Sequence, residues 1–399
     1  MFSLVLAPFY IAVNVYIILR FFSWLECCHK VFKLKRLKAS LAVVYSLLAF
    51  ALVAAFFLNP QSNLRRVIQL ISNYWLGILL YIVLVVTLGH LLWFILGHMF
   101  KAFRPRFAQK RRNAIISGVL SIAIIAGISG YGMYHATDIK VNNYSVNINK
   151  QVEGRKKLRV VLIADLHLGY SIGLKHMQKM VKLINEQKPD IVCIAGDIYD
   201  NNYDAIGNPE EIAKTLSTIQ STYGTYACWG NHDVDEKILA GFTFDNNAKK
   251  SHNERMREFL KKANINLLED ETVLIDNQFY VSGRVDEDKP ATEDNERKTP
   301  DELLNGLDKT KPVIVMYHEP DELSELSEAG CDLLLCGHTH NGQTFPGNLL
   351  IKAFWENPTG YLKKGDMHNI VTSGVGVWGP FMRVGTDAEI VNIGVSFGE

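Results

Sequence analysis

Apolar residues follow one pattern in the first third of the chain and another in the rest. The first third contains four apolar blocks that hold no acidic residue. Each approaches or exceeds the length of about 20 residues that a helix needs to cross a bilayer. One such block would also fit a buried helix of a soluble protein, but four together predict a membrane anchor. The expected spans are residues 2–24, 39–58, 74–100 and 114–134.

The first block has the length of a cleaved signal peptide as well as that of a span. Secretory signals carry positive charge before the apolar stretch and small residues at the cleavage site. Phe2–Leu19 has neither, so we expect it to be retained. His90 and His98 fall within or at the end of the third block, where no carboxylate is available to pair with them. They are expected to be neutral, hydrogen-bonded or interfacial residues rather than part of an ion path.

From about residue 156, short β-branched apolar runs alternate with helix-like stretches, which is typical of a soluble α/β domain. The runs that predict strands are 158–164, 190–195, 226–229, 313–317 and 331–336. The stretches that predict helices are 174–186, 209–219, 254–263 and 320–329. The sequence therefore predicts an anchor over 1–137, a linker over 138–155 and an α/β domain over 156–399. Functional residues are expected just beyond the strands, because ligands bind there in α/β sheets.

Charge is distributed unevenly between these parts. Residues 1–138 contain 14 Lys and Arg but two acidic residues, whereas residues 139–399 contain 28 basic and 39 acidic residues. An acidic domain is poorly suited to nucleic acid polymers, because their binding depends on Lys and Arg that neutralise phosphates. The anchor implies the lipid bilayer as a partner, and a nucleic acid polymer is not expected as one.

The basic residues of the anchor predict its orientation, because short loops rich in Lys and Arg stay on the cytoplasmic side. Two loops are strongly basic: one spans Lys30–Lys38 and the other Lys101–Arg112. The loop between them, 59–73, has only Arg65 and Arg66. With four spans, both termini and the α/β domain are therefore expected on the extracytoplasmic side of the cell membrane.

Polar residues that bind metals follow five of the predicted strands. In chain order they are Asp165-Leu166-His167, Gly196-Asp197, Gly230-Asn231-His232-Asp233, His318 and Gly337-His338-Thr339-His340. Carboxylates, imidazoles and an amide oxygen together suit Mn, Fe or Zn better than Ca or Mg, which prefer shells of oxygen alone. An Asp-x-His or His-x-His pair on an extended chain places both side chains on one face, so both members reach the same site.

This order of motifs resembles the calcineurin-like metallophosphoesterase superfamily, whose pattern is D-x-H, G-D, G-N-H-D/E, H and G-H-x-H. The stretches 337–343 and 374–390 look like the membrane-associated bacterial phosphodiesterase branch, although that branch more often has Gly-Gly-Gln after the last His, where this chain has Asn341. The resemblance implies a four-layer α/β/β/α sandwich. It implies two divalent metal ions, one bound by Asp165, His167, Asp197 and His340 and the other by Asp197, Asn231, His318 and His338.

In this ligand set Asp197 bridges the two ions. Two cations about 3.5–4 Å apart need a shared anionic ligand, and they can also share a hydroxide that attacks a phosphoester. His232 is not needed as a ligand, so we expect it to protonate the leaving oxygen, with Asp233 orienting its imidazole. The alternative is that His232 only forms hydrogen bonds within its own loop.

Apolar residues near the last motif bear on the substrate. The stretches Phe345–Tyr361 and Trp378–Met382 contain several aromatic and aliphatic side chains, which fit either core packing or a shelf for acyl chains. We expect a phosphodiesterase or phosphatase that acts on a small-molecule or lipid phosphoester, favouring an amphiphilic one such as an envelope lipid. A nucleotide phosphodiesterase and a non-catalytic membrane sensor remain as alternatives.

Four cysteines lie in or beside the predicted strands. They are Cys193, Cys228, Cys331 and Cys336. Free Cys in a strand is usually a small buried apolar residue, whereas an outward-facing domain also permits disulfides, whose pairing the sequence does not determine.

Overall fold

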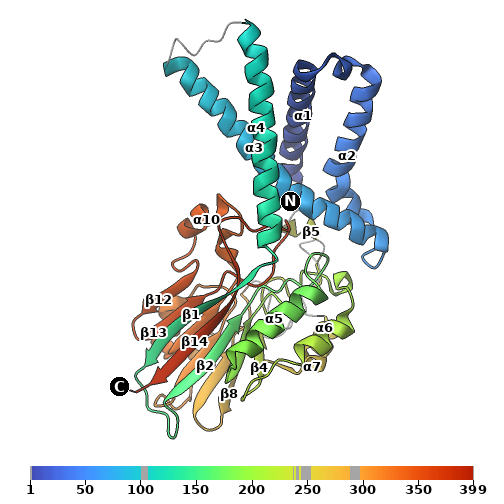
Figure 1. Cartoon of the computed structure of the whole chain (residues 1–399). Coiled ribbons are helices and arrows are strands. Elements are labelled where there is room, and N and C mark those ends of the chain that lie inside the picture. Colours follow the sequence, from blue (N-terminus) through green and yellow to red (C-terminus); the bar gives the residue numbers. More distant parts are fainter. Residues whose placement is uncertain are drawn as a thin grey trace. The chain divides into compact units, whose positions relative to one another are not determined.

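The computed structural model describes residues 2–99, 107–236, 238–239, 242–243, 253–287 and 297–398. It contains two compact units (Figure 1). The helical unit runs to Tyr134 and includes the short segments Ile238–Phe244 and Gly379–Met382. The α/β unit starts at His135 and holds the rest of the chain.

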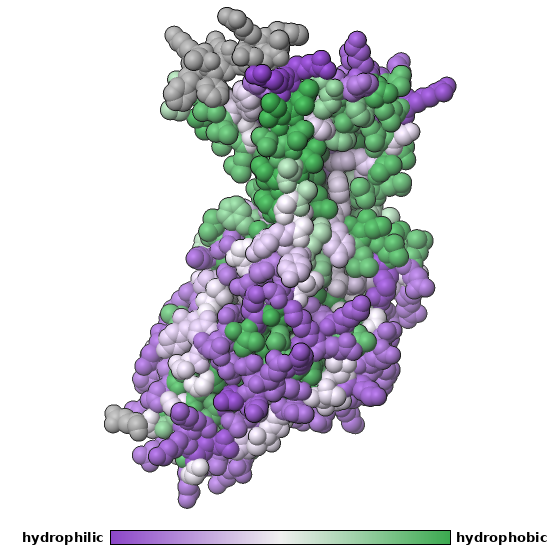
Figure 2. Space-filling view, in the orientation of Figure 1, coloured by the Kyte–Doolittle hydropathy of each residue, from purple (hydrophilic) through white to green (hydrophobic). Residues whose placement is uncertain are grey.

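The helical unit contains the helices expected from the four apolar blocks. They are α1 (Phe2–Cys28), α2 (Lys35–Phe57), α3 (Asn63–Met99) and α4 (Phe107–His135). All four are long and apolar enough to cross a membrane, and Figure 2 shows hydrophobic side chains over their surface. With 37 residues, α3 is about 55 Å long, because it begins with a polar segment ahead of the apolar block. The basic residues Lys101, Arg104 and Arg106 lie outside the described part of the chain.

Both histidines of α3 are hydrogen-bonded, as expected. His90 contacts Tyr16 Oη through Nδ1 at 3.0 Å and Arg20 Nη2 through Nε2 at 2.7 Å. Arg only donates hydrogen bonds, so Nε2 accepts and the ring carries no proton there. His98 Nδ1 lies 2.8 Å from the carbonyl oxygen of Phe94, one turn earlier in the helix.

The α/β unit is built on two six-stranded sheets. The first sheet consists, in spatial order, of β1 (Ile139–Ile148), β14 (Ala388–Phe397), β2 (Lys157–Ile163), β3 (Ile191–Ala195), β4 (Thr225–Cys228) and β7 (Ile265–Leu267). The second consists of β12 (Gly360–Lys364), β13 (Met367–Val371), β11 (Leu333–Cys336), β10 (Val313–Met316), β9 (Phe279–Gly283) and β8 (Glu271–Ile275). Within them, β2, β3 and β4 are parallel neighbours, and so are β10 and β11.

The main core lies between the sheets. Alternate residues of β2, such as Val160 and Leu162, share one buried cluster with Ile314 of β10 and Leu335 of β11. The outer face of the first sheet packs on α5 (Leu174–Gln187), α6 (Pro209–Leu216) and α7 (Glu254–Lys262) (Figure 1). The outer face of the second packs on α8 (Pro300–Leu303) and α9 (Leu323–Ala329). These four layers confirm the expected α/β/β/α sandwich.

The region expected to be a linker contains a strand instead. Residues 139–148 form β1, which pairs in parallel with β14 at ten positions. The sequence does not reveal this strand because only Ile139, Val146 and Ile148 are fully buried, and they alternate with exposed Asn and Lys residues. The α/β unit therefore begins at His135 rather than near residue 156.

All six cysteines are free thiols in the structure, which settles the question that the sequence left open. The four in the α/β unit are buried. Burial raises the pKa of the Cys193 thiol to about 12 and raises that of Cys228 as well.

Candidate metal centre

Residues that follow five strands meet at one end of the two sheets, and they include every metal ligand that the sequence suggests. They are Asp165 and His167 after β2, Asp197 after β3, Asn231 and His232 after β4, His318 after β10, and His338 and His340 after β11. Because the strands of each set run in the same direction, their carboxyl ends lie side by side. The face-to-face packing of the sheets then brings the two sets together.

One group of possible ligands comprises Asp165, His167 and His340, all of which are buried. The Nε2 atoms of His167 and His340 lie 3.0 Å apart, and His340 Nε2 lies 3.4 Å from Asp165 Oδ1. Burial, together with nearby His167 and Arg383, holds the pKa of His340 well below its usual value. His340 is therefore neutral, which is the state that binds a metal.

A second group comprises Asp165, Asp197 and His318. His318 Nδ1 lies 2.7 Å from the carbonyl oxygen of Ala195, to which it donates, and this turns Nε2 toward Asp197 Oδ2 at 3.0 Å. This buried Nε2 makes no hydrogen bond of normal geometry in the described structure. Burial lowers the pKa of His318, but the carboxylates of Asp197 and Asp165 outweigh it and hold the pKa well above its usual value. The two carboxylates thus favour positive charge at this nitrogen, which a bound cation would also supply.

Asn231 and His338 lie beside the second group. Asn231 Oδ1 is 3.1 Å from His338 Nδ1, and the ring centroids of His338 and His318 are 5.2 Å apart. Burial, reinforced by the nearby His318, lowers the pKa of His338 to about 3, so its imidazole is neutral. Asn231, His318 and His338 thus present an amide oxygen and two ring nitrogens to one region.

The backbone at this site adopts an uncommon conformation. The residues Asp165, His167, Asp197, His338 and His340 all have φ between 46° and 72°. Left-handed conformations cost non-glycine residues of the order of 1–3 kcal/mol, and they cluster at functional sites. Here they turn the chain sharply at the strand ends and direct the side chains toward one another.

The glycines of the motifs provide space for these turns. A Cβ atom on Gly337 would lie 2.6 Å from Asp165 Oδ2, and one on Gly230 would collide with the Asp197 carboxylate. Both glycines are therefore required by the close approach of two loops.

His232 lies beside the two groups without belonging to the predicted ligand sets. Its backbone N–H donates to Asp197 Oδ1 at 2.8 Å, and its Nδ1 contacts Asn201 Oδ1. The ring centroid lies 5.1 Å from that of His167 and 6.1 Å from that of Trp378. The contact with Asn201 engages Nδ1, and Nε2 is the second ring nitrogen of His232.

Asp233 accepts backbone N–H groups with both carboxyl oxygens, whereas the sequence-based expectation pairs it with the imidazole of His232. Its Oδ1 accepts the backbone N–H of Tyr199 at 2.8 Å, and its Oδ2 accepts that of Gly230 at 2.7 Å. Burial and nearby Asp197 raise the pKa of this carboxyl to about 7. Asp233 joins the loops after β3 and β4, while Asn201 contacts the imidazole.

Three further residues of the site were not predicted from the sequence: Asp200, Asn201 and Arg383. Asp200 lies close enough to His167 and His232 for the three to form another possible ligand group. Arg383 is fully buried, and its Nη2 lies 2.7 Å from the carbonyl oxygens of both Ser373 and Gly376. The same Nη2 also contacts the carbonyl oxygen of Gly374 and His340 Nδ1, each at 3.2 Å.

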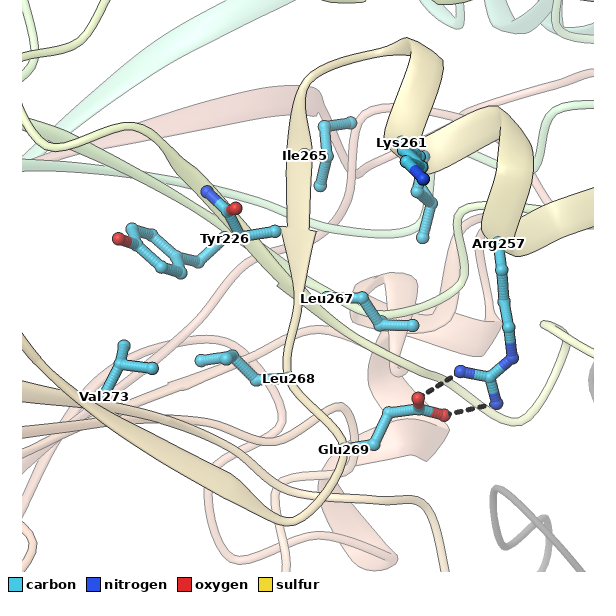
Figure 3. A pocket seen from close by; sticks show the side chains of 10 residues that line it. Tyr226, Arg257, Lys261, Ile265, Leu267, Leu268, Glu269 and Val273 are labelled. Atoms are coloured by element: carbon cyan, nitrogen blue, oxygen red, sulfur yellow. Dashed lines mark hydrogen bonds and ion pairs between the residues drawn. The ribbon is translucent and has the colours of Figure 1, made fainter.

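A pocket of about 540 Å³ lies elsewhere, beside β7 (Figure 3). Its walls include Tyr226, Leu260 and Leu267, and Arg257 and Glu269 form an ion pair at its edge. None of the possible metal ligands lines it.

Comparisons with known proteins agree with this geometry. Residues 158–342 match the calcineurin-like phosphoesterase family. A transmembrane protein with metallophosphoesterase domain from Danio rerio is 29% identical over 308 residues, which cover 72% of this chain and 65% of that protein. A metallophosphoesterase from Helicobacter pylori is 29% identical over 300 residues, or 74% of this chain and 75% of that protein.

A third similar protein is phosphodiesterase YaeI from Escherichia coli, which is 28% identical over 233 residues, covering 55% of this chain and 75% of that protein. The chain thus spans less than two thirds of the Danio rerio protein but three quarters of each bacterial one. The four apolar helices and the similar transmembrane proteins together indicate a multi-pass membrane protein. The α/β unit of this membrane protein is a calcineurin-like metallophosphoesterase domain, which belongs to a class of metal-dependent phosphoester hydrolases.

Proposed function

We propose that this protein is a membrane-anchored phosphoesterase that uses two divalent cations to hydrolyse a phosphodiester, pyrophosphate or phosphomonoester bond. The position of Asp197 supports the two-cation site best. Its Oδ2 lies 3.0 Å from His318 Nε2 and 3.7 Å from His167 Nε2. Since His167 belongs to one group of ligands and His318 to the other, these distances support the proposal that Asp197 binds both cations.

The residues fit such a pair of ions. Asp165, His167, Asp197 and His340 would hold one, and Asp197, Asn231, His318 and His338 the other. This mixture of nitrogen and oxygen donors suits Mn, Fe or Zn. When bound, a pair of cations neutralises phosphoryl oxygens and lowers the pKa of water. The buried Nε2 of His318, which faces two carboxylates, supports a cation at that place.

His232 would protonate the leaving oxygen. Its N–H bond to Asp197 fixes the loop, and Asn201 engages Nδ1, so Nε2 is directed away from both contacts. Asn201 is thus a positioning residue, the role that the sequence suggested for Asp233.

The aromatic surroundings favour an amphiphilic substrate. The Trp355 ring lies 5.1 Å from that of His338, and Trp378 lies beside His232. These indoles would contact the apolar part of a lipid phosphoester. They would equally stack on a nucleobase, which keeps a nucleotide as the second candidate. We also propose that the domain is extracytoplasmic, as the basic loops predict.

Hydrolysis of bis(4-nitrophenyl) phosphate by the full-length protein tests the proposed activity. Chelation followed by dialysis should abolish turnover, and Mn should restore it. Parallel assays with envelope lipids and nucleotides should show faster turnover of a lipid. Full turnover in excess chelator would rule out the two-cation site, and preference for nucleotides would select the second candidate.

A further inference from the structure

Exposed apolar side chains of the α/β unit gather on one segment. We call Phe345, Leu349, Leu350 and Phe354 the apolar rim, and their side chains are 44%, 59%, 61% and 78% exposed. They lie on and around α10 (Gly347–Leu350) and the 3₁₀ turn that follows it. Figure 2 shows hydrophobic side chains gathered where Figure 1 labels α10. Isolated exposed apolar residues are ordinary, but clusters mark interaction surfaces.

The rim stands on a fixed backbone rather than a loose loop. The N–H of Phe345 donates to the carbonyl oxygen of Val384 at 2.8 Å, and the Asn348 side chain donates to that of Gly385 at 3.2 Å. These hydrogen bonds fix the backbone in a conformation that exposes the apolar side chains to water, which is energetically unfavourable. Such an arrangement indicates a partner that covers them.

The rim is also continuous with the metal centre. Phe345 follows His340 by five residues, and Trp355, next to Phe354, packs against His338. Whatever covers the rim therefore lies near residues of the candidate metal centre.

Chain connectivity keeps the α/β unit near the bilayer. The membrane helix α4 ends at His135 and β1 begins at Ile139, and a connection of this length spans at most about 14 Å. A second connection is equally short: Gly379–Met382 belongs to the helical unit, where the Phe381 ring packs 5.6 Å from that of Tyr74 on α3. Short stretches of chain therefore join the α/β unit to the segments of the helical unit.

We propose that the apolar rim inserts into the interface of the bilayer that the four helices cross. Short elements with large apolar side chains bind there by burying them at the boundary between headgroups and acyl chains. Insertion would hold the metal centre at the depth of lipid phosphates, so that a phosphoester is reached without leaving the bilayer. Insertion of the apolar rim requires only that the protein lies in a membrane. The access of the metal centre to lipid phosphates rests, in addition, on the proposed hydrolytic function.

A fluorophore at the rim tests the insertion directly. In full-length protein with Cys27 and Cys28 changed to Ser and reconstituted in nanodiscs, the F354C variant would carry an environment-sensitive dye. The matched control is L274C, because Leu274 on β8 is 42% exposed and lies outside the rim. We expect blue-shifted emission and quenching by brominated phospholipids at residue 354 but not at 274. Equal, water-like emission at both positions would overturn the proposal.

Turnover provides an independent test. The L349D/L350D variant should lower hydrolysis of a dioleoyl 4-nitrophenyl phosphodiester in bilayers by about tenfold or more. Its turnover of the water-soluble bis(4-nitrophenyl) phosphate should stay within a factor of about two of wild type. The control variant L274D should change neither rate. The proposal would be contradicted if L349D/L350D hydrolysed both substrates as fast as wild type, or if it lost the same fraction of turnover on both. If wild-type protein cleaves neither substrate, the proposed function fails. The fluorophore experiment then still tests whether the apolar rim inserts into the bilayer.

Discussion

His232 and Asp197 are joined by a hydrogen bond, yet they are expected to do different work. His232→Ala should slow turnover by about 10²–10⁴-fold, the usual contribution of general acid catalysis, because the proposed ligand set is complete without it. The loss should shrink with 4-nitrophenol, which departs without a proton, and grow with an alkyl alcohol. Turnover of both substrates beside bound metal is the measurement. An equal loss on both substrates would show that His232 is not the acid.

Asp197→Ala should instead lose metal. The variant removes the carboxylate that is proposed to bridge the two cations, so the cations would repel each other without this shared anion. We expect bound Mn, measured by elemental analysis after gel filtration, to fall well below two per chain, whereas His232→Ala keeps it. Normal occupancy in Asp197→Ala would contradict a bridging role.

The sequence identifies ligands better than it identifies the residues that support them. Asp165, His167 and the others follow apolar strands in short motifs, so their convergence follows from the parallel arrangement. Asn201 and Arg383 belong to no such pattern, because their roles arise from loops that meet only in the folded chain. Asp233 is expected to orient His232 because it is the next residue in sequence, yet its two carboxyl oxygens accept the N–H groups of Tyr199 and Gly230.

Among the elements, β1 decides where the domain starts. Fragment 135–399 should fold, whereas fragment 156–399 should melt at lower temperature because it lacks β1. Burial of Ile139, Val146 and Ile148 contributes about 1.5–3 kcal/mol each, which is comparable with the 5–15 kcal/mol of a typical domain. Thermal unfolding followed by circular dichroism compares them directly. The same melting temperature for both would show that β1 adds nothing.

The elements found from sequence are those with a strong hydrophobic signal. All five predicted strands end within two residues of the observed ones, as do the starts of helices α5, α6 and α7. The sequence does not predict β1 because only three of its ten residues are buried, and a strand at a sheet edge needs few apolar positions. Its partner β14 is far away in sequence, so no local pattern could reveal the pairing.

At the scale of the whole molecule, labelling of cysteine thiols tests the orientation of the protein in the membrane. Cys27 and Cys28 are partly exposed at the basic end of α1, while the four thiols of the α/β unit are buried and burial raises their pKa. A membrane-impermeant maleimide should therefore label wild-type protein only after cells are permeabilised. The L274C variant should be labelled in intact cells. The reverse pattern would place the α/β domain in the cytoplasm.

The place of β14 in the first sheet also governs how the chain is made. β14 lies between β1 and β2, and Asn143 and Asn392, which bond across β1 and β14, are 249 residues apart. The ribosome therefore completes both the anchor and the entire ligand set before the sheet can close. Until then β1 lacks the neighbour that joins it to the rest of the first sheet. A stop codon before Ala388 would spare every proposed ligand and still separate β1 from β2.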